Sequence, residues 1–149
     1  MDDACALCAL VGGELIWRDH VCRVVRVEGP EQEAFPGFCR VIWNDHCTEM
    51  TDMSPIQSQH LMSVVFAVER SVRRLVRPDK VNLASLGNVV PHVHWHVIPR
   101  WQNDSHFPTP IWGTAINGVS PATTGKAVSV AELSAVLAEE LKDLEATAA

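Results

Sequence analysis

The sequence of 149 residues contains no Lys/Arg-rich block, no internal repeat and no apolar run near the length of a membrane span. A helix that crosses a bilayer needs about 20 apolar residues, so we expect no membrane partner. Twelve basic and 18 acidic residues give a net charge of −6, which argues against a general nucleic-acid binder. A small anionic ligand remains compatible with this charge, because a pocket can be locally positive.

Two further absences bear on the compartment and on the domain organisation. The acidic start Met1-Asp2-Asp3 lacks the basic region of a signal peptide. The five cysteines are odd in number and not densely placed, which predicts reduced thiols in a cytoplasmic protein. Apolar residues make up 47% of the chain. We therefore expect a single domain over residues 1–149, with its core at about 5–110 and an excursion and a helix over 111–149.

Glycine and proline divide the first half of the chain into elements. The β-branched and apolar runs 21–27 and 38–43 predict two strands, and residues 29–37 predict the loop between them. A capping-box signature, Ser54-Pro55-Ile56-Gln57, starts a long helix that Pro78 stops. Apolar residues recur along it at helical spacing: Leu61, Val64, Val65, Val68, Val72, Leu75 and Val76.

The second half predicts two more strands and another helix. The strands cover residues 80–86 and 92–98, and Pro99 closes the second one. Residues 101–128 are rich in Pro, Gly, Thr and Asn and predict an irregular excursion. The tail forms a helix with one apolar stripe: Leu133, Val136, Leu137, Leu141 and Leu144. This order predicts an α+β fold, an antiparallel sheet with a long central helix and a C-terminal helix.

Three histidines alternate along the last predicted strand, at positions 92, 94 and 96. Alternate side chains of a strand share a face, so His92, His94 and His96 are expected to point one way, and the apolar residues between them toward the core. One chemistry for such a face is nucleophilic attack by one imidazole with proton transfer by another. The other is a catalytic zinc held by two or three of these histidines, with an open position for water.

The segment His-Val-His-Trp-His-Val-Ile resembles the signature of the histidine-triad family, His-x-His-x-His followed by two apolar residues. The Gly87 turn before it, Pro99-Arg100 after it and the upstream His46 agree with this resemblance. Residues 37–110 look especially like a bacterial branch described as diadenosine-tetraphosphate-hydrolase-like.

The resemblance implies a nucleotidyl hydrolase or transferase that cleaves an adenine nucleotide at its α-phosphate. Its substrate would be a dinucleoside polyphosphate or a nucleoside phosphoramidate. His94 would be the nucleophile, and His96 would contact phosphate or assist the leaving group. His92 and His46 would orient and polarise the site. No cofactor is expected for catalysis, and the family usually forms homodimers.

Four residues are candidates for substrate contacts by the same resemblance. Asn88 and Val89 stand where the family usually has Gln followed by Ser or Thr, so Val89 removes a hydroxyl. Asn82 is similar to a polar strand residue near the phosphates, and Arg100 could neutralise outer phosphates. Ordinary surface or strand-end roles are the alternatives. Trp101 and Trp112 would wall a purine pocket or cover the core.

The Cys5-Ala-Leu-Cys8 pair has two interpretations. Some family members join such a pair to two histidines around a structural zinc, here His46 and His92, and this donor set suits closed tetrahedral zinc. Two small reduced core cysteines are the alternative. Two rival functions also stay open at this stage: a zinc-dependent hydrolase that uses the triad as ligands, and a nucleotide-binding module with negligible turnover.

Overall fold

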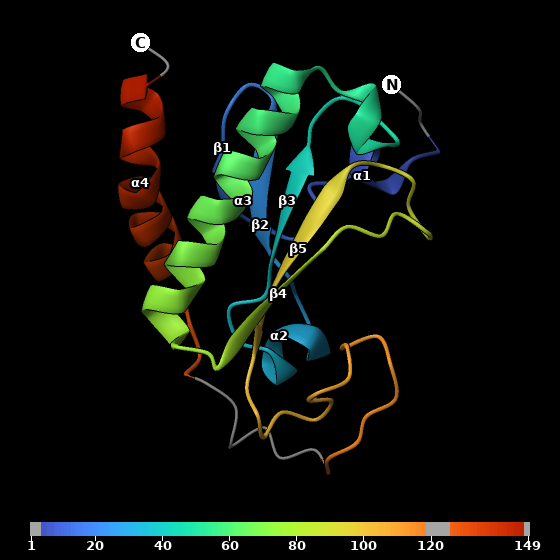
Figure 1. The fold of residues 1–149 in the computed structure, drawn as a ribbon, viewed down its shortest axis with the longest axis vertical. Coiled ribbons are helices and arrows are strands. Elements are labelled where there is room, and N and C mark those ends of the chain that lie inside the picture. The colour runs from blue at the N-terminus through green and yellow to red at the C-terminus, as the bar shows by residue number, and fades with distance from the viewer. Residues whose placement is uncertain (1–3, 119–125, 148–149) are drawn as a thin grey trace.

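The computed structural model describes residues 4–118 and 126–147, which form a five-stranded antiparallel sheet and two long helices (Figure 1). In chain order the strands are β1 (Glu14–Arg18), β2 (Cys22–Arg26), β3 (Cys39–Trp43), β4 (Lys80–Ala84) and β5 (His94–Arg100). Their order across the sheet is β1-β2-β3-β5-β4. The predicted α+β fold is therefore confirmed. Residues 119–125, part of the predicted irregular excursion, lie outside the described residues.

Three local predictions were wrong. β1 was not expected; of its five residues only Ile16 is buried, and Leu15 is exposed. The predicted loop 29–37 contains a short helix, α2 (Pro30–Ala34), which starts with proline in its first turn. Pro99 does not end its strand: β3 pairs with β5 only as far as Val97, so the proline lies where β5 has one partner strand.

The long helix α3 (Pro55–Val76) follows the 3-10 turn η1 (Met50–Asp52) and begins as predicted. The Ser54 hydroxyl accepts a hydrogen bond from the Gln57 amide, and the Gln57 side chain accepts one from the Ser54 amide. This capping box satisfies two backbone donors that the helix leaves unpaired. The helix ends at Val76. Arg77 follows with a left-handed backbone conformation, and Pro78 comes next.

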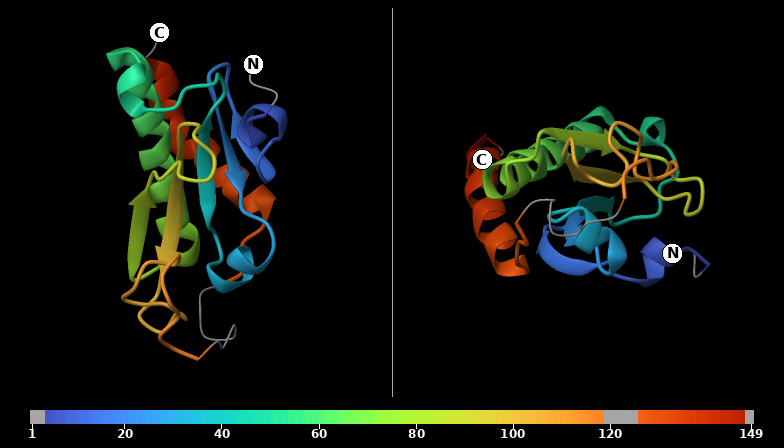
Figure 2. Two further views of the ribbon diagram at one scale, coloured as in Figure 1. Left: turned by 90° about the vertical axis from the view of Figure 1, so that its right-hand side faces the viewer. Right: turned by 90° about the horizontal axis from the view of Figure 1, so that it is seen from below.

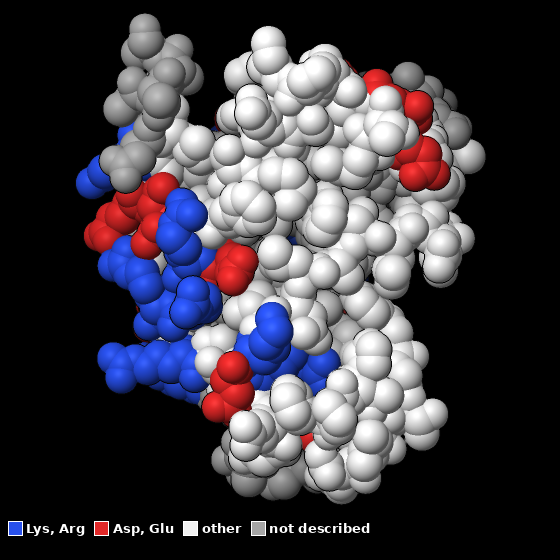
Figure 3. Space-filling view, viewed as in Figure 1, with Lys and Arg blue, Asp and Glu red and all other residues white. Residues whose placement is uncertain are grey.

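The C-terminal helix α4 (Val130–Thr147) packs beside α3 and against β1 (Figure 2). Its Glu140 accepts hydrogen bonds from Arg70 and Arg74 of α3 at 2.7 and 3.0 Å. Basic side chains gather on this side of the molecule (Figure 3). No helix in the described part of the chain is long and apolar enough to span a bilayer.

The two faces of the sheet differ because alternate residues point in opposite directions. On β3, Val41 packs in the core under α3 and α4, whereas Ile42 packs on the other face against Leu7 of α1 (Ala6–Ala9). On β5, Val97 joins the helix-covered core, as predicted, and Ile98 joins a small cluster on the other face. The face turned away from α3 therefore carries two small apolar clusters, and His94 and His96 lie on it.

Candidate active site

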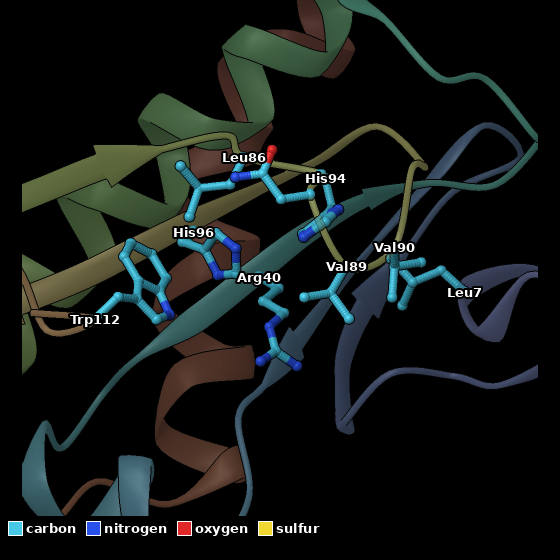
Figure 4. A pocket seen from close by; sticks show the side chains of 10 residues that line it. Leu7, Arg40, Leu86, Val89, Val90, His94, His96 and Trp112 are labelled. Atoms are coloured by element: carbon cyan, nitrogen blue, oxygen red, sulfur yellow. The ribbon is translucent and has the colours of Figure 1, made fainter.

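A pocket of about 460 Å³ opens on this second face of the sheet (Figure 4). Strands β3 and β5 form its floor, the turn after β4 forms one wall, and the loop after β5 forms another. Its described lining consists of Leu7, Arg40, Leu86, Gly87, Asn88, Val89, Val90, His94, His96 and Trp112. Two of the three predicted triad histidines thus meet in one cavity.

The ring of His94 is fixed by the backbone of the same segment. Its Nδ1 lies 2.6 Å from the carbonyl oxygen of His92. A carbonyl oxygen can only accept, so Nδ1 carries the proton and Nε2 keeps its lone pair. Burial lowers the pKa of His94, and the nearby Arg40 guanidinium lowers it further, against the opposing effect of this hydrogen bond. His94 is therefore a neutral imidazole with a free basic nitrogen near pH 7.

His96 lies next to His94 and is held by rings rather than by hydrogen bonds. Its ring meets Trp112 nearly edge-on at 4.9 Å between centroids, and Phe38 packs at 5.8 Å. Burial first, then the charges of His94 and Arg40, lower the pKa of His96 to about 3. Its Nδ1 is buried and has no hydrogen-bond partner in the described part of the chain. In the tautomer with the ring proton on Nε2, neutral His96 can donate a hydrogen bond to a ligand in the pocket.

His92 does not share the pocket with the other two histidines, contrary to the prediction that all three share one strand face. It precedes β5, which begins at His94, and its side chain is turned toward the cysteine pair. The Nδ1 atom of His92 lies 3.4 Å from the sulfur of Cys5 and 3.6 Å from that of Cys8. His46 brings its Nδ1 to 3.4 Å from the Cys8 sulfur. The Cys/His set predicted from the CxxC pair therefore comes together.

The geometry of this Cys/His cluster suits a tetrahedral metal. One ligand atom from each of Cys5, Cys8, His46 and His92 lies within 4.8 Å of the others. Zinc with Zn–S near 2.3 Å and Zn–N near 2.0 Å needs ligand atoms about 3.6 Å apart. The Nε2 atom of His92 donates to the Trp43 carbonyl at 2.6 Å, which leaves Nδ1 as a free ligand atom. Metal-binding histidines are commonly held in this way through their second nitrogen.

The turn that lines the pocket carries Asn88 and Val89. The Val89 side chain is 93% exposed, so it does not face the core. Asn88 is also exposed, and both residues belong to the pocket lining. The structure thus brings this predicted pair to the pocket.

Asn82 and Arg100 are not brought to the pocket. Arg100 is only 2% exposed, and its guanidinium forms two hydrogen bonds with the carboxylate of Asp104 at 2.8 and 3.0 Å. It also donates to the side chain of Asn82 and to the carbonyl of Thr109, both at 2.8 Å. This placement gives Asn82 and Arg100 protein partners in place of the phosphates expected for them.

Six lining residues were not among the predicted site residues, and two of them, Arg40 and Trp112, carry large polar or aromatic side chains. Arg40 is the second residue of β3, before the apolar run Val41–Trp43, and pairs in register with His96. The signal for it was a charged residue within an otherwise apolar strand. Trp112 was left between pocket and core, and it lies in the pocket, whereas Trp101 is buried in the main core. No disulfide joins the five cysteines.

A zinc held by all three triad histidines is not favoured by this arrangement. Among the described residues, His94 and His96 belong to no group of three or more side chains that could share a metal. His92 already contributes its side chain to the Cys/His cluster. A second group, Asp19, Cys22 and His60, lies elsewhere, and its atoms are hydrogen-bonded among themselves and to the backbone.

Known proteins match both the sequence and the fold. Over 87 residues, the chain is 29% identical to an AP-4-A phosphorylase of Mycobacterium tuberculosis, covering 54% of this chain and only 45% of that protein. Histidine-triad proteins from Sinorhizobium meliloti and Bradyrhizobium japonicum share the fold at 21% and 23% identity. The Sinorhizobium meliloti protein has a TM-score of 0.65, over 88% of this chain and 91% of that one. The Bradyrhizobium japonicum protein has a TM-score of 0.63, over 85% of this chain and 90% of that one. The HIT domain model matches residues 14–103. The chain therefore belongs to the HIT family.

Proposed function

We propose that this HIT protein is a nucleotidyl hydrolase or transferase that acts on an adenine nucleotide through a nucleotidyl-histidine intermediate. The observation that carries the proposal is the hydrogen bond from Nδ1 of His94 to the backbone of His92. It leaves a neutral imidazole nitrogen with a lone pair in an open pocket, which is the state that a nucleophile requires.

In the first half of the proposed reaction, Nε2 of His94 attacks the α-phosphorus. The new N–P bond forms as the bond from phosphorus to the leaving group breaks, and the leaving group departs with its electron pair. His96, beside His94, donates the proton that the leaving group takes up. The anionic substrate raises the proton affinity of His96 relative to the empty pocket, because an opposite charge favours the imidazolium. Asn88 and the turn backbone donate to the phosphoryl oxygens, where charge develops.

In the second half an acceptor attacks the same phosphorus and the N–P bond breaks, which regenerates neutral His94. With water as acceptor the product is the nucleoside monophosphate. The proton that water loses passes to His96, which gave its own proton to the leaving group in the first half, and reaches solvent as the product leaves. With inorganic phosphate as acceptor the product is the nucleoside diphosphate. The partly matching relative named AP-4-A phosphorylase makes phosphate a worthwhile second acceptor to test.

The proposed substrates are a dinucleoside polyphosphate or a nucleoside phosphoramidate. A turnover panel of diadenosine tetraphosphate, diadenosine triphosphate and adenosine 5′-phosphoramidate, each with and without inorganic phosphate, compares both leaving groups and both acceptors. We also propose a homodimer in the cytoplasm, which size-exclusion chromatography and cell fractionation would test.

The nucleophile is tested by His94→Ala. Its turnover should fall by about three orders of magnitude or more, while nucleotide binding persists, because the covalent route is lost and the pocket remains. His94→Gly should regain activity with added imidazole. His20→Ala, at an exposed histidine outside the pocket, is the matched control. Turnover of His94→Ala within tenfold of wild type would exclude the covalent route, and nucleotide binding without turnover in the wild type would indicate a binding module.

We further propose that Cys5, Cys8, His46 and His92 hold a structural zinc. The support is the donor set and the tautomer of His92, whose second nitrogen is held by Trp43. A closed four-ligand site supplies folding free energy rather than chemistry. No step of the proposed reaction passes through it.

A further inference from the structure

Arg40 is the one formally charged side chain in the described lining of the pocket. It comes from β3, directly across from His96 on β5, in the register Arg40↔His96. Residues opposite one another in an antiparallel pair point to the same face with Cβ atoms about 5 Å apart. Its guanidinium therefore belongs to the same small volume as the two imidazoles (Figure 4).

The hydrogen-bonding capacity of Arg40 is largely unused. A guanidinium has five N–H donors. Within residues 4–118 and 126–147, Arg40 makes one hydrogen bond, to the Gly12 carbonyl at 3.3 Å, and a loose ion pair with Glu31 at 3.7 Å. Arg23 on β2 provides the contrast, with four hydrogen bonds to Leu7, Leu10, Val11 and Asn44 at 2.6–3.1 Å.

The positive charge of Arg40 disfavours protonation of the two buried histidines beside it, His94 and His96. An apolar residue would fill this position of the floor without that penalty, and Phe38 and Ile42 of the same segment already do so nearby. The unused donors and the unfavourable charge both become favourable once an anion occupies the pocket. Arginine is well suited to bind phosphate through a charge-assisted, bidentate pair of hydrogen bonds.

We infer that Arg40 binds the non-bridging oxygens of the phosphoryl group attacked by His94, a role that rests on the proposed function. Val89 leaves the turn without the hydroxyl usual in the family, and Arg40 supplies a charged donor from the β3 floor of the pocket. Because charge accumulates on these oxygens during transfer, Arg40 contributes to both binding and rate.

The inference is tested by binding of AMP and of adenosine to wild type and Arg40→Met. Loss of a charge-assisted contact should weaken AMP binding by about ten- to a hundredfold and leave adenosine within about twofold. Arg40→Lys, which keeps the charge and loses the planar fork, should lie between. Arg73→Met on α3, an exposed position away from the pocket, controls for loss of an arginine. Thermal melting of each variant verifies folding.

Glu31→Gln separates this role from a structural one. If Arg40 served only its ion pair with Glu31, Glu31→Gln would weaken AMP binding as Arg40→Met does. If Arg40 binds phosphate, the loss of its competitor should leave AMP binding unchanged or slightly tighter. Equal weakening of AMP and adenosine by Arg40→Met, or no weakening of either, would overturn the inference. So would a wild-type protein that does not bind AMP.

Turnover distinguishes this inference from the proposed function. With a productive substrate, Arg40→Met should lower kcat/KM by about ten- to a hundredfold. If the wild type turns over substrate and kcat/KM of Arg40→Met stays within threefold of it, the role of Arg40 is refuted and the proposed hydrolase stands. Arg40-dependent AMP binding without any turnover in the wild type would refute the hydrolase and leave the phosphate contact standing.

Discussion

Arg40 and Arg100 lie on neighbouring strands of one sheet, and the regions around them differ in how their polar groups are satisfied. Around Arg100, four hydrogen bonds of 2.8–3.0 Å reach Asp104, Asn82 and Thr109. Asp104 in turn accepts hydrogen bonds from the amides of Trp101, His106 and Phe107. Around Arg40 the contacts are long, and His96 in the same pocket keeps a buried nitrogen without a partner.

The difference shows which arrangement is complete without a ligand. Buried polar groups are expensive unless they are hydrogen-bonded. The junction of Arg100 and Asp104 meets that requirement from within the protein, and it fixes the start of the loop that carries Trp112 to the pocket. In the pocket, only some of the buried polar groups have hydrogen-bond partners. We take the saturated junction as structural and the unsaturated pocket as the place where a substrate completes the hydrogen bonds.

The largest expected effect comes from breaking the junction on its acidic side. Asp104 is fully buried and paired with Arg100, so Asp104→Asn leaves an uncompensated buried charge. We expect a loss of about 3–5 kcal/mol in unfolding free energy, measured by urea titration. The control is Glu140→Gln, which weakens exposed arginine pairs between α3 and α4 and should cost less than about 1 kcal/mol. Similar losses in the two variants would contradict the structural role of the junction.

The Cys/His cluster is proposed to be completed by zinc, as the pocket is by a substrate. Zinc at a hundred times its Kd should raise the unfolding free energy of the wild type by about 2.7 kcal/mol. Cys5→Ser/Cys8→Ser should lose this gain together with about one zinc per chain, because binding free energy is folding free energy. Turnover should survive at least in part. Elemental analysis and thermal melting provide the readouts, and a metal-free wild-type protein would rule the site out.

A smaller effect is expected in the turn that faces Arg40. If Asn88 and the turn backbone replace the missing hydroxyl, Asn88→Ala should lower kcat/KM about tenfold and Val89→Thr should change little. Because the Val89 side chain is exposed, Val89→Thr buries no hydroxyl, and its melting temperature should match wild type. A rate gain in Val89→Thr, with near-normal activity in Asn88→Ala, would show that the hydroxyl is missing without replacement.

The smallest effect is the pH dependence of stability that His96 contributes. Its pKa is about 3 in the fold and near its ordinary value of 6.5 in the unfolded chain. Between these values the unfolded chain binds the extra proton, so stability falls as pH falls from 6.5 toward 3. The slope from His96 is at most about 1.4 kcal/mol per pH unit. His96→Leu should show a shallower decline than wild type in urea titrations at pH 6.5 and 5.5. Equal slopes would contradict this assignment.

Sequence reasoning found the parts of the fold that rest on strong periodicity or local chemistry. The α3 helix had its capping box and its apolar stripe, and the alternation of Val97 and His96 identified the two faces of β5. The CxxC pair and its histidines were found through family resemblance. β1 was missed because its burial arises from contact with β2 and α4, which no local pattern encodes.

The same reasoning named Arg100 as a candidate substrate contact, whereas the arginine that lines the pocket is Arg40. Arg100 follows the triad directly, so its nearness in sequence suggested the site, but Asp104 four residues later binds it in the interior. Arg40 is more than fifty positions from the triad and meets it only through the pairing of β3 with β5. Which arginine has donors to spare depends on contacts across the sheet, and these are known only from the structure.

The acceptor that orients His94 is a main-chain carbonyl, and this has a consequence for how the site tolerates mutation. Replacing the side chain of His92 alters the Cys/His cluster but leaves its carbonyl in the chain. The state of the His94 ring therefore depends on the path of the backbone before β5 and on no single side chain. Its orientation should persist through sequence drift that preserves this path, and a loss of activity in a His92 variant cannot by itself be attributed to a lost catalytic group.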